Sequence, residues 1–274
     1  MRNKEIFKKK IWEYYRKQRR DLPWRKNITP YRILVSEIML QQTQVERVRE
    51  KFQYFIKTFP DITTLARAHK ERVLAAWQGL GYNRRALALK KAAEIIVRKY
   101  GGKLPEDIQL LEQLPGVGKA TAGALRAFAF NKSSIFIETN IRRAYIQFFF
   151  PRRRNVQDKE IESLIQATLS ESQKTREWYC ALMDYGAMLG KCDRIKNPNR
   201  RSAHYVKQKP FKGSERELRG RVLKYILENG GVTERQLIKM TGEKRIVRMG
   251  KVLVSLTKEG FISKNGKEYS IGRK

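Results

Sequence analysis

Apolar residues recur at helical spacing along almost the whole chain, and this pattern constrains the fold more than any other feature. Glycine and proline separate the periodic segments, and the alternation typical of strands is nearly absent before residue 260. The body of the chain, residues 1–205, is therefore predicted to be all-α with short connections. We expect its helices at residues 4–19, 30–58 (which can break near Gln42), 62–68, 70–79, 83–100, 107–113, 119–129, 140–149, 158–171 and 176–189.

The composition changes near residue 190. Residues 191–213 are polar and basic and contain two prolines, which indicates an extended connector. Thr233 and Gln236 have the spacing of a capping box at the start of a short helix. Three helices followed by a basic hairpin are typical of a winged helix, and a small helical cap on the main domain is the alternative. We expect helices at 214–229, 233–240 and 244–259, and a hairpin over 261–271 with a type I′ turn at Asn265-Gly266.

The chain is strongly basic, with 60 Lys and Arg against 27 Asp and Glu, a net charge of +33. A polyanionic partner explains this excess best, because cationic side chains along a phosphate backbone release its condensed counterions. A generically basic surface and a cationic protein at a membrane surface also fit the charge. The sequence has no stretch near 18 apolar residues and no charged-then-apolar leader. We expect a monomer without a membrane partner, cytoplasmic and nucleoid-associated if the source is prokaryotic.

Cysteine and histidine are too scarce for a disulfide scaffold or a zinc site. The chain contains only Cys180, Cys192, His69 and His204, and a tetrahedral zinc site would need all four at a spacing they do not have. We therefore expect no metal bound by side chains. Any chemistry should use carboxylates, hydroxyls and the backbone.

The most informative segment runs from Leu114 to Gly123, with Gly116 and Gly118 two positions apart. Such glycines let the backbone turn tightly and approach another backbone closely. The turn lies between two predicted helices, so its free amides at a helix N-terminus can hold a phosphate. A Gly-x-Gly turn alone is weak evidence, because helix–helix connections often contain glycine.

Together with its flanks, this segment resembles the helix-hairpin-helix of the HhH-GPD superfamily of DNA glycosylases. Further segments resemble the MutY branch, whose members act on mispaired adenine. These are Leu22-Pro23-Trp24-Arg25, Pro30-Tyr31, Ser36 to Val45, Gly79-Leu80-Gly81-Tyr82 and Leu182 to Met188. The resemblance covers about residues 5–190. It implies a mostly α, two-lobed glycosylase fold over 1–205, with an inner lobe 22–130 and a second lobe of 1–21 plus 131–205, a linker 206–213 and the winged-helix-like domain 214–274.

The resemblance also implies roles for single residues. Glu37 would protonate the departing base and later help to activate water. Gln42 and Tyr82 would enter the base stack beside the mismatch. The base pocket would include Trp24, Arg25 and Ala120, and the other DNA contacts would come from Leu114, Gly116, Val117, Gly118, Lys119, Thr121, Asn140 and Arg143.

The chemistry of the reaction independently requires two carboxyl groups. Breaking a deoxynucleoside bond develops a sugar cation and an anionic base, so one carboxyl must donate a proton and a second must stabilise the cation. Glu37 lies among Val35, Ile38 and Leu40, where burial would raise its pKa. Without the surrounding motif, Glu37 would be interpreted as a solvated glutamate on a helix face.

The second carboxylate departs from the family pattern. Members of the superfamily carry an aspartate in a Leu-Asp-Gly-Asn-Val run, whereas this chain reads Ile137-Glu138-Thr139-Asn140-Ile141. The extra methylene adds about 1.5 Å of reach. An adjusted backbone, a different nucleotide or impaired chemistry could follow, since a misplacement near 1 Å can cost roughly a hundredfold in rate. We expect an active Glu37/Glu138 pair.

Two more departures bear on chemistry and cofactors. Ala120 occupies the position of the Schiff-base lysine of bifunctional relatives, and Lys119 is rotated by about 100° from it on a helix. We therefore expect a monofunctional enzyme, with strand cleavage by Lys119 as a lesser alternative. Relatives usually carry four cysteines after the Gly-Ala-Met segment. Here Cys192 stands alone, and Arg200, Arg201, Ala203 and His204 lie where cysteines are expected, so no iron–sulfur cluster is predicted.

The resemblance also bears on a bound cation and on the C-terminal domain. A monovalent cation bound by hairpin carbonyls near Leu114 and Val117 is implied by the family. Residues 214–274 are too short for the domain related to nucleotide pyrophosphohydrolases with which such enzymes read oxidised guanine, and they lack its acidic motif.

These observations predict a base-excision glycosylase acting on double-stranded DNA with a mismatched or damaged base. Adenine opposite guanine or 8-oxoguanine is the expected target. Removal of mismatched thymine or uracil is one alternative. A DNA-binding protein with weak catalysis, in which Glu138 marks lost chemistry, is the other.

Overall fold

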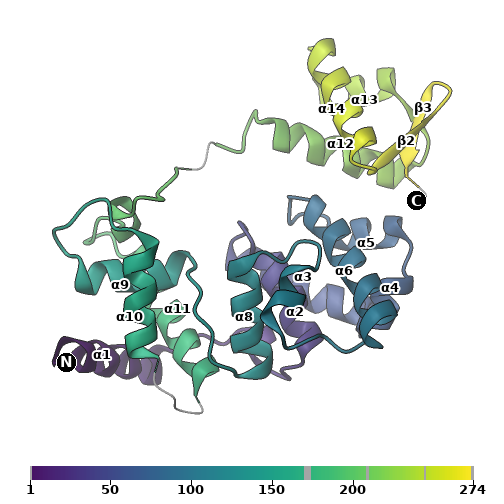
Figure 1. Cartoon of the computed structure of the whole chain (residues 1–274). Coiled ribbons are helices and arrows are strands. Elements are labelled where there is room, and N and C mark those ends of the chain that lie inside the picture. Colours follow the sequence, from purple (N-terminus) through teal and green to yellow (C-terminus); the bar gives the residue numbers. More distant parts are fainter. Residues whose placement is uncertain (1, 170–173, 208–209, 244, 273–274) are drawn as a thin grey trace. The chain divides into compact units, whose positions relative to one another are not determined.

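The computed structural model describes residues 2–169, 174–207, 210–243 and 245–272 (Figure 1). Helices dominate the part of the chain up to residue 207, as the periodicity predicts. Its elements are α1 (Arg2–Gln18), η1 (Pro23–Arg25), α2 (Pro30–Leu40), α3 (Val45–Thr58), α4 (Ile62–Arg67), α5 (Lys70–Trp77), α6 (Arg84–Tyr100), α7 (Ile108–Glu112), α8 (Lys119–Phe130), α9 (Thr139–Phe149), α10 (Asp158–Thr168), α11 (Thr175–Lys191) and η2 (Pro198–Arg201).

The remaining elements form the C-terminal module, residues 210–272. They are α12 (Glu215–Asn229), β1 (Val232–Thr233), α13 (Glu234–Thr241), α14 (Ile246–Lys258), β2 (Ile262–Asn265) and β3 (Glu268–Ile271). The antiparallel strands have the order β1-β3-β2. Leu218, Val222, Leu237, Leu253 and Phe261 are buried in its core. The winged-helix assignment and the domain boundaries stay predictions.

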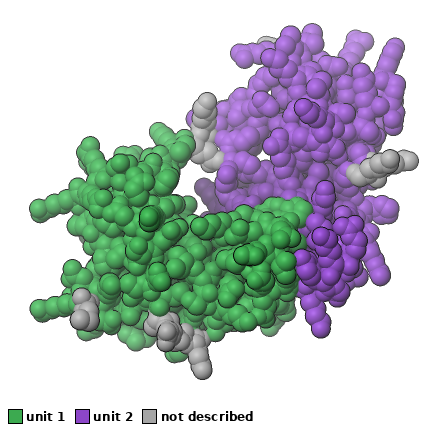
Figure 2. Space-filling view, in the orientation of Figure 1, with its two compact units in different colours: residues 1–37, 104–207 green, residues 38–103, 208–274 purple. Residues whose placement is uncertain are grey.

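The chain divides into two compact units, coloured separately in Figure 2. Unit 1 comprises residues 1–37 and 104–207, and unit 2 comprises residues 38–103 and 208–274. The boundary falls inside α2, directly after Glu37. Unit 1 therefore holds Glu37 together with the hairpin, α9 and α11, whereas unit 2 holds α3 to α6 and the C-terminal module.

Most predicted helices are confirmed within a few residues. The predicted break near Gln42 is real: α2 ends at Leu40, α3 begins at Val45, and Gln42 adopts φ 53°. The capping box between Thr233 and Gln236 is present at α13. Residues 170–171, the predicted end of α10, and residue 244, the predicted start of α14, lie outside the described residues.

The prediction of an extended connector over residues 191–213 is wrong for residues 198–201. Residues 198–201 form η2, because Asn197 accepts a hydrogen bond from the Asn199 amide and Pro198 starts the turn. A parallel bridge joins Ser202 to Val156, with Asn199 Nδ2 donating to Thr139 O at 2.9 Å. This segment is therefore fastened to the start of α9.

The predicted type I′ turn at Asn265-Gly266 is also wrong, by one residue. Asn265 pairs with Glu268 inside the ladder, so Gly266 and Lys267 are the two central residues. A type I′ turn needs positive φ at both central residues, whereas here only Gly266 has it, at 59°. A glycine at the first central position is typical of a type II′ turn. The two-residue strand β1 is too short to produce visible alternation in the sequence.

Close packing of α9 on α11 positions the start of α9. A Cβ on Gly186 of α11 would lie 2.0 Å from Asn140 O, so only glycine permits this approach. Arg143 lies over Gly190 and donates through Nη1 to Gly186 O at 2.7 Å and to Asn140 Oδ1 at 2.8 Å. The first turn of α9, which follows Glu138, is thereby fixed against α11.

None of the helices in the described part of the chain has the length and apolar character needed to cross a membrane.

Replacing Gly186 with Ala should destabilise unit 1 and displace the first turn of α9, since the added methyl group meets backbone atoms that cannot rotate away. Overpacking of this kind costs roughly 1–3 kcal/mol, which corresponds to a fall of about 3–10 °C in the thermal midpoint. The control is Gly220→Ala in α12, where nothing lies within 4 Å of the added Cβ. Thermal unfolding followed by circular dichroism compares the two. Equal midpoints for both variants would contradict the packing account.

Candidate active site

Glu138 is the N-cap residue of α9, and its carboxylate is bound by the first amides of that helix. Oε1 accepts from Asn140 N at 2.7 Å and from Ile141 N at 2.8 Å, and Oε2 accepts from Asn140 Nδ2 at 3.2 Å. Burial raises the pKa of Glu138, against the opposing effects of these two amides and of Arg143. The longer side chain is thus accommodated by capping the helix, where the amides and the helix dipole stabilise an anion.

Glu37 is half-buried in α2, between the buried residues Ser36 and Ile38. Burial and the charge of Glu138 raise the pKa of Glu37 to about 8, whereas the charge of Arg25 opposes the rise. A carboxyl group with this pKa is mostly protonated at neutral pH and can donate a proton. The structure therefore brings Glu37 and Glu138 into electrostatic contact within unit 1. Their environments differ, because backbone amides oppose the rise in pKa at Glu138 and no such amide is among the effects on Glu37.

A buried ion-pair network holds Arg25 beside this pair. Asp184 of α11 is 1% exposed and accepts from Arg25 Nη1 and Nη2, both at 2.8 Å, and from Arg20 Nε at 2.5 Å. Burial alone would raise the pKa of Asp184, but the hydrogen bonds and charges of Arg25 and Arg20 lower it below its ordinary value. Trp24, in the same short helix as Arg25, is buried. Asp184 lies in a segment singled out in the sequence, where nothing indicated its partners.

The predicted hairpin forms the turn between α7 and α8. Val117 N donates to Leu114 O at 3.0 Å, both side chains are buried, and Gly116 has φ 81°. Gly118 is the N-cap of α8 with φ −91°, and a Cβ there would meet nothing within 4 Å. Neither its φ nor internal packing requires glycine at this position.

The other predicted site residues differ in their exposure and in the elements that carry them. Lys119 and Ala120 are exposed in the first turn of α8, and Thr121 is half-buried. Asn140 and Arg143 lie with Glu138 at the start of α9. Gln42 and Tyr82 belong to unit 2, and each is held in the left-handed region, with φ of 53° and 48°.

Arg85 connects the loops that carry Gln42 and Tyr82, a role that no pattern in the sequence indicates. Its side chain is buried, and Nη1 donates to Ile38 O at 2.9 Å, to Met39 O at 2.8 Å and to Gln41 O. Nη2 donates to Thr43 Oγ1 at 2.9 Å and to Gly81 O at 3.0 Å. Burial lowers the pKa of Arg85 to about 10, so the guanidinium stays charged at neutral pH.

The residues present do not fit an iron–sulfur cluster. Cys180 is buried in α11 and Cys192 is the residue that ends it, and two thiols cannot supply four ligands. Within the described ranges, no group of three or more His, Cys, Asp or Glu side chains could hold a metal ion. The segment that follows α11 is bound to α9 by hydrogen bonds, among them Arg143 Nε to Asn197 Oδ1 at 3.3 Å.

Comparisons with known sequences find one family model and several relatives that agree with it. Residues 35–171 match the family model described as HhH-GPD superfamily base excision DNA repair protein. The adenine DNA glycosylase of Buchnera aphidicola (subsp. Baizongia pistaciae) is 38% identical over 64% of this chain and 50% of its own length. The adenine DNA glycosylase of Mycobacterium tuberculosis is 36% identical over 64% of this chain and 58% of its own length. The chain thus spans about half the length of these curated relatives. The adenine DNA glycosylase of Mycolicibacterium smegmatis is 29% identical over 92% of this chain and 91% of its own.

Solved structures show the same fold. A thermostable thymine-DNA glycosylase is 26% identical with a TM-score of 0.63, covering 71% of this chain and 91% of that one. A covalent endonuclease III–DNA intermediate has a TM-score of 0.59 at 17% identity, covering 70% and 88% of the two chains. At that identity the second likeness concerns the fold alone.

Replacing Arg85 with Met should loosen both loops of unit 2, because the carbonyl groups that Arg85 binds lose their donors. Leaving buried polar groups unpaired costs on the order of 1–3 kcal/mol each, although water can satisfy some of them. Amide hydrogen exchange over residues 38–43 and 79–85 should accelerate. The control is Arg98→Met, an exposed position in the same helix α6. Unchanged exchange in Arg85→Met, relative to that control, would contradict this role.

Proposed function

Because the chain belongs to the HhH-GPD superfamily of base excision DNA repair proteins, we propose that it is a monofunctional DNA glycosylase that removes adenine mispaired with guanine or 8-oxoguanine. The resemblance to the superfamily and its adenine glycosylase branch, inferred from the sequence, is confirmed by the matches. The observation that carries the proposal is the Glu37/Glu138 pair, in which burial and mutual repulsion raise the pKa of Glu37 to about 8.

The two carboxyl groups divide the reaction between them. As the N-glycosidic bond breaks, its electron pair leaves with the base, which takes the proton of Glu37. The carboxylate of Glu138, held by the amides of Asn140 and Ile141, stabilises the positive charge that develops on the sugar. Water then adds to the sugar carbon and its proton passes to Glu37, which restores the acid.

We assign the remaining candidate residues to DNA and base binding. The hairpin amides would contact a phosphate, and the net charge of +33 favours a polyanionic partner. Carbonyl groups at Leu114 and Val117 would bind a monovalent cation. Gln42 and Tyr82 would stack in the duplex, and Trp24, Arg25 and Ala120 would form the base pocket. The other proposed DNA contacts are Gly116, Gly118, Lys119, Thr121, Asn140 and Arg143.

Removal of mismatched thymine is a second candidate. The solved structure of a thymine-DNA glycosylase is 26% identical to this chain, and the match covers 91% of the chain in that structure. The same acid and carboxylate would serve either base, so the choice depends on the atoms that contact the base edge.

Excision assays on four duplexes test the proposal. The full chain is incubated with duplexes containing A·G, A·8-oxoguanine, T·G and U·G pairs, and breaks are developed with alkali. Breaks at adenine are expected, and Glu37→Gln should slow them by about 10²–10⁴-fold. The control Glu50→Gln changes an exposed glutamate of α3 and should retain full activity.

Each other result rejects a defined part of the proposal. Breaks only at thymine or uracil would favour the second candidate. Tight binding without breaks in any duplex would identify a DNA-binding protein without the activity. Breaks that form before alkali treatment would contradict monofunctional chemistry, and undiminished activity of Glu37→Gln would remove Glu37 from its role.

A further inference from the structure

The C-terminal module contacts the side chain of Tyr82. Arg216, in the first turn of α12, donates through Nη1 to the Tyr82 hydroxyl, and its Cζ lies 5.5 Å from the centre of the Tyr82 ring. Arg85 Cζ lies 5.3 Å from the same centre. Tyr82 is half-buried, so its ring is partly open to solvent while it contacts two guanidinium groups. All these residues belong to unit 2.

A second contact joins the C-terminal module to the same loop. Glu259, at the end of α14, accepts from Arg84 Nε at 2.5 Å and from Arg219 Nη2 at 2.7 Å. The hydrogen bond from Arg84 is the largest of the effects that lower the pKa of Glu259 to about 2. Arg84 lies two residues after Tyr82, so this ion pair holds the module next to the loop that carries the tyrosine.

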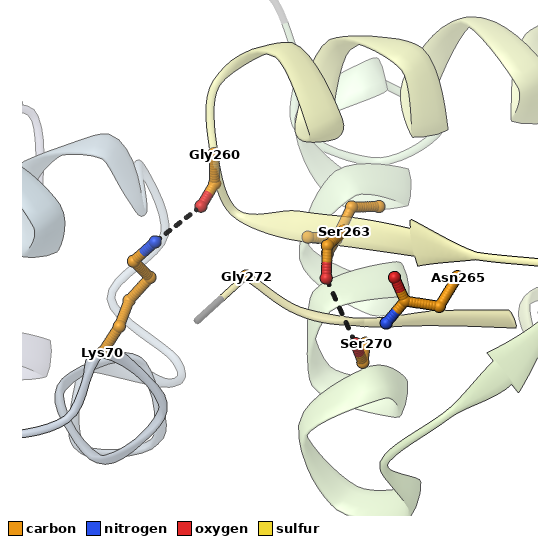
Figure 3. Close-up of a pocket in the computed structure, with 7 residues that line it drawn as sticks. Lys70, Gly260, Ser263, Asn265, Ser270 and Gly272 are labelled. Atoms are coloured by element: carbon orange, nitrogen blue, oxygen red, sulfur yellow. Dashed lines mark hydrogen bonds between the residues drawn. The ribbon is translucent and has the colours of Figure 1, made fainter. Parts of the chain in front are cut away.

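A third contact lies at the start of α5. Lys70 Nζ donates to Gly260 O at 2.9 Å, and Figure 3 shows the lysine extending from its helix to this carbonyl. Burial lowers the pKa of Lys70, which is consistent with an ammonium group partly covered by the module. The module is therefore attached to the rest of unit 2 at α5 and at the start of α6.

We propose that Arg216 is a positioning residue for Tyr82, through which the C-terminal module helps to hold the duplex at the mispair. This inference rests on the proposed function and deepens it. A cation near a ring and a hydrogen bond to its hydroxyl together restrict the orientation of the ring. A side chain already held in its binding orientation loses less conformational freedom when a base stacks on it. The backbone of Tyr82 lies in the left-handed region, with φ 48°, and Arg216 binds the hydroxyl at the far end of its side chain.

Arg216 also differs from an ordinary phosphate contact in a way that can be measured. A charge that only attracts phosphate should strengthen binding to any duplex equally. A residue that orients Tyr82 should matter more for a mispaired duplex, where stacking is disturbed, and should lose this effect when Tyr82 can no longer bond to it.

A double-mutant cycle on the full chain tests this distinction. Tyr82→Phe, Arg216→Gln and the double variant are made in a Glu37→Gln background, so that the duplex stays intact. The dissociation constants for an A·8-oxoguanine duplex and a matched duplex are measured by fluorescence anisotropy. Arg221→Gln, an exposed arginine of α12, removes the same charge and is the control.

Arg216→Gln should weaken binding to the mispaired duplex roughly 3- to 10-fold more than Arg221→Gln, and this excess should disappear in the Tyr82→Phe background. Glu259→Gln, which removes the ion pair to Arg84 without touching Tyr82, should weaken mispair binding in the same direction. Its effect should be less than additive with that of Arg216→Gln.

Three results would overturn the proposal. Equal effects of Arg216→Gln and Arg221→Gln on both duplexes would make Arg216 a simple phosphate contact. Full additivity with Tyr82→Phe would separate it from Tyr82, and tighter binding by Arg216→Gln would make the contact inhibitory. These affinities do not depend on base release. A wild-type chain that excises nothing would therefore defeat the proposed function while the cycle still decides the role of Arg216.

Discussion

Burial of Glu37 beside the carboxyl group of Glu138 is the constraint on which the candidate site depends. Two nearby carboxyl groups in a poorly solvated site do not both ionise readily, so their surroundings decide which one keeps its proton. Burial raises the pKa of both groups, but Glu138 also accepts hydrogen bonds from two backbone amides at the start of α9, which favour its charged form. The packing of Gly186 against Asn140 and the ion pair of Arg25 with Asp184 hold these surroundings in place. These surroundings support the proposed roles of Glu37 as the acid and of Glu138 as the carboxylate.

Substitution of glutamate for the aspartate of the family pattern has a local solution in this structure. Glu138 has φ −119°, an ordinary extended value, and its longer side chain folds back onto the amides of Asn140 and Ile141. The C-terminal module is attached to the rest of unit 2 through Glu259 and Lys70. Both features concern how parts of the chain are held in place.

Much of the fold and the candidate pair could be predicted from the sequence, because helical periodicity and the segments around Glu37 and Gly116 are local signals. The hydrogen-bond partners of Arg85 could not be predicted, because the carbonyl groups that it binds lie up to 47 positions away in the sequence. The chain also contains 60 Lys and Arg residues, and no sequence pattern distinguishes Arg85 from the others. The contact of Arg216 with Tyr82 could not be predicted for the same reason, since the two residues are 134 positions apart. The hairpin turn was misplaced by one residue because Asn265-Gly266 is a strong turn signal, whereas strand pairing determines which residues are central. η2 was missed because its stability comes from contacts with α9.

The central claim is that burial and the neighbouring Glu138 carboxylate together keep Glu37 protonated at neutral pH, and titration of the carboxyl carbons by ¹³C NMR tests this most directly. The Glu37 signal, identified by its loss in Glu37→Gln, should titrate near pH 8, so that the proton is present below that pH and lost above it. In Glu138→Gln the pKa of Glu37 should fall, because the repelling charge is gone while burial remains. A Glu37 that titrates in the ordinary range of glutamates, or whose pKa is the same in Glu138→Gln, would contradict the account.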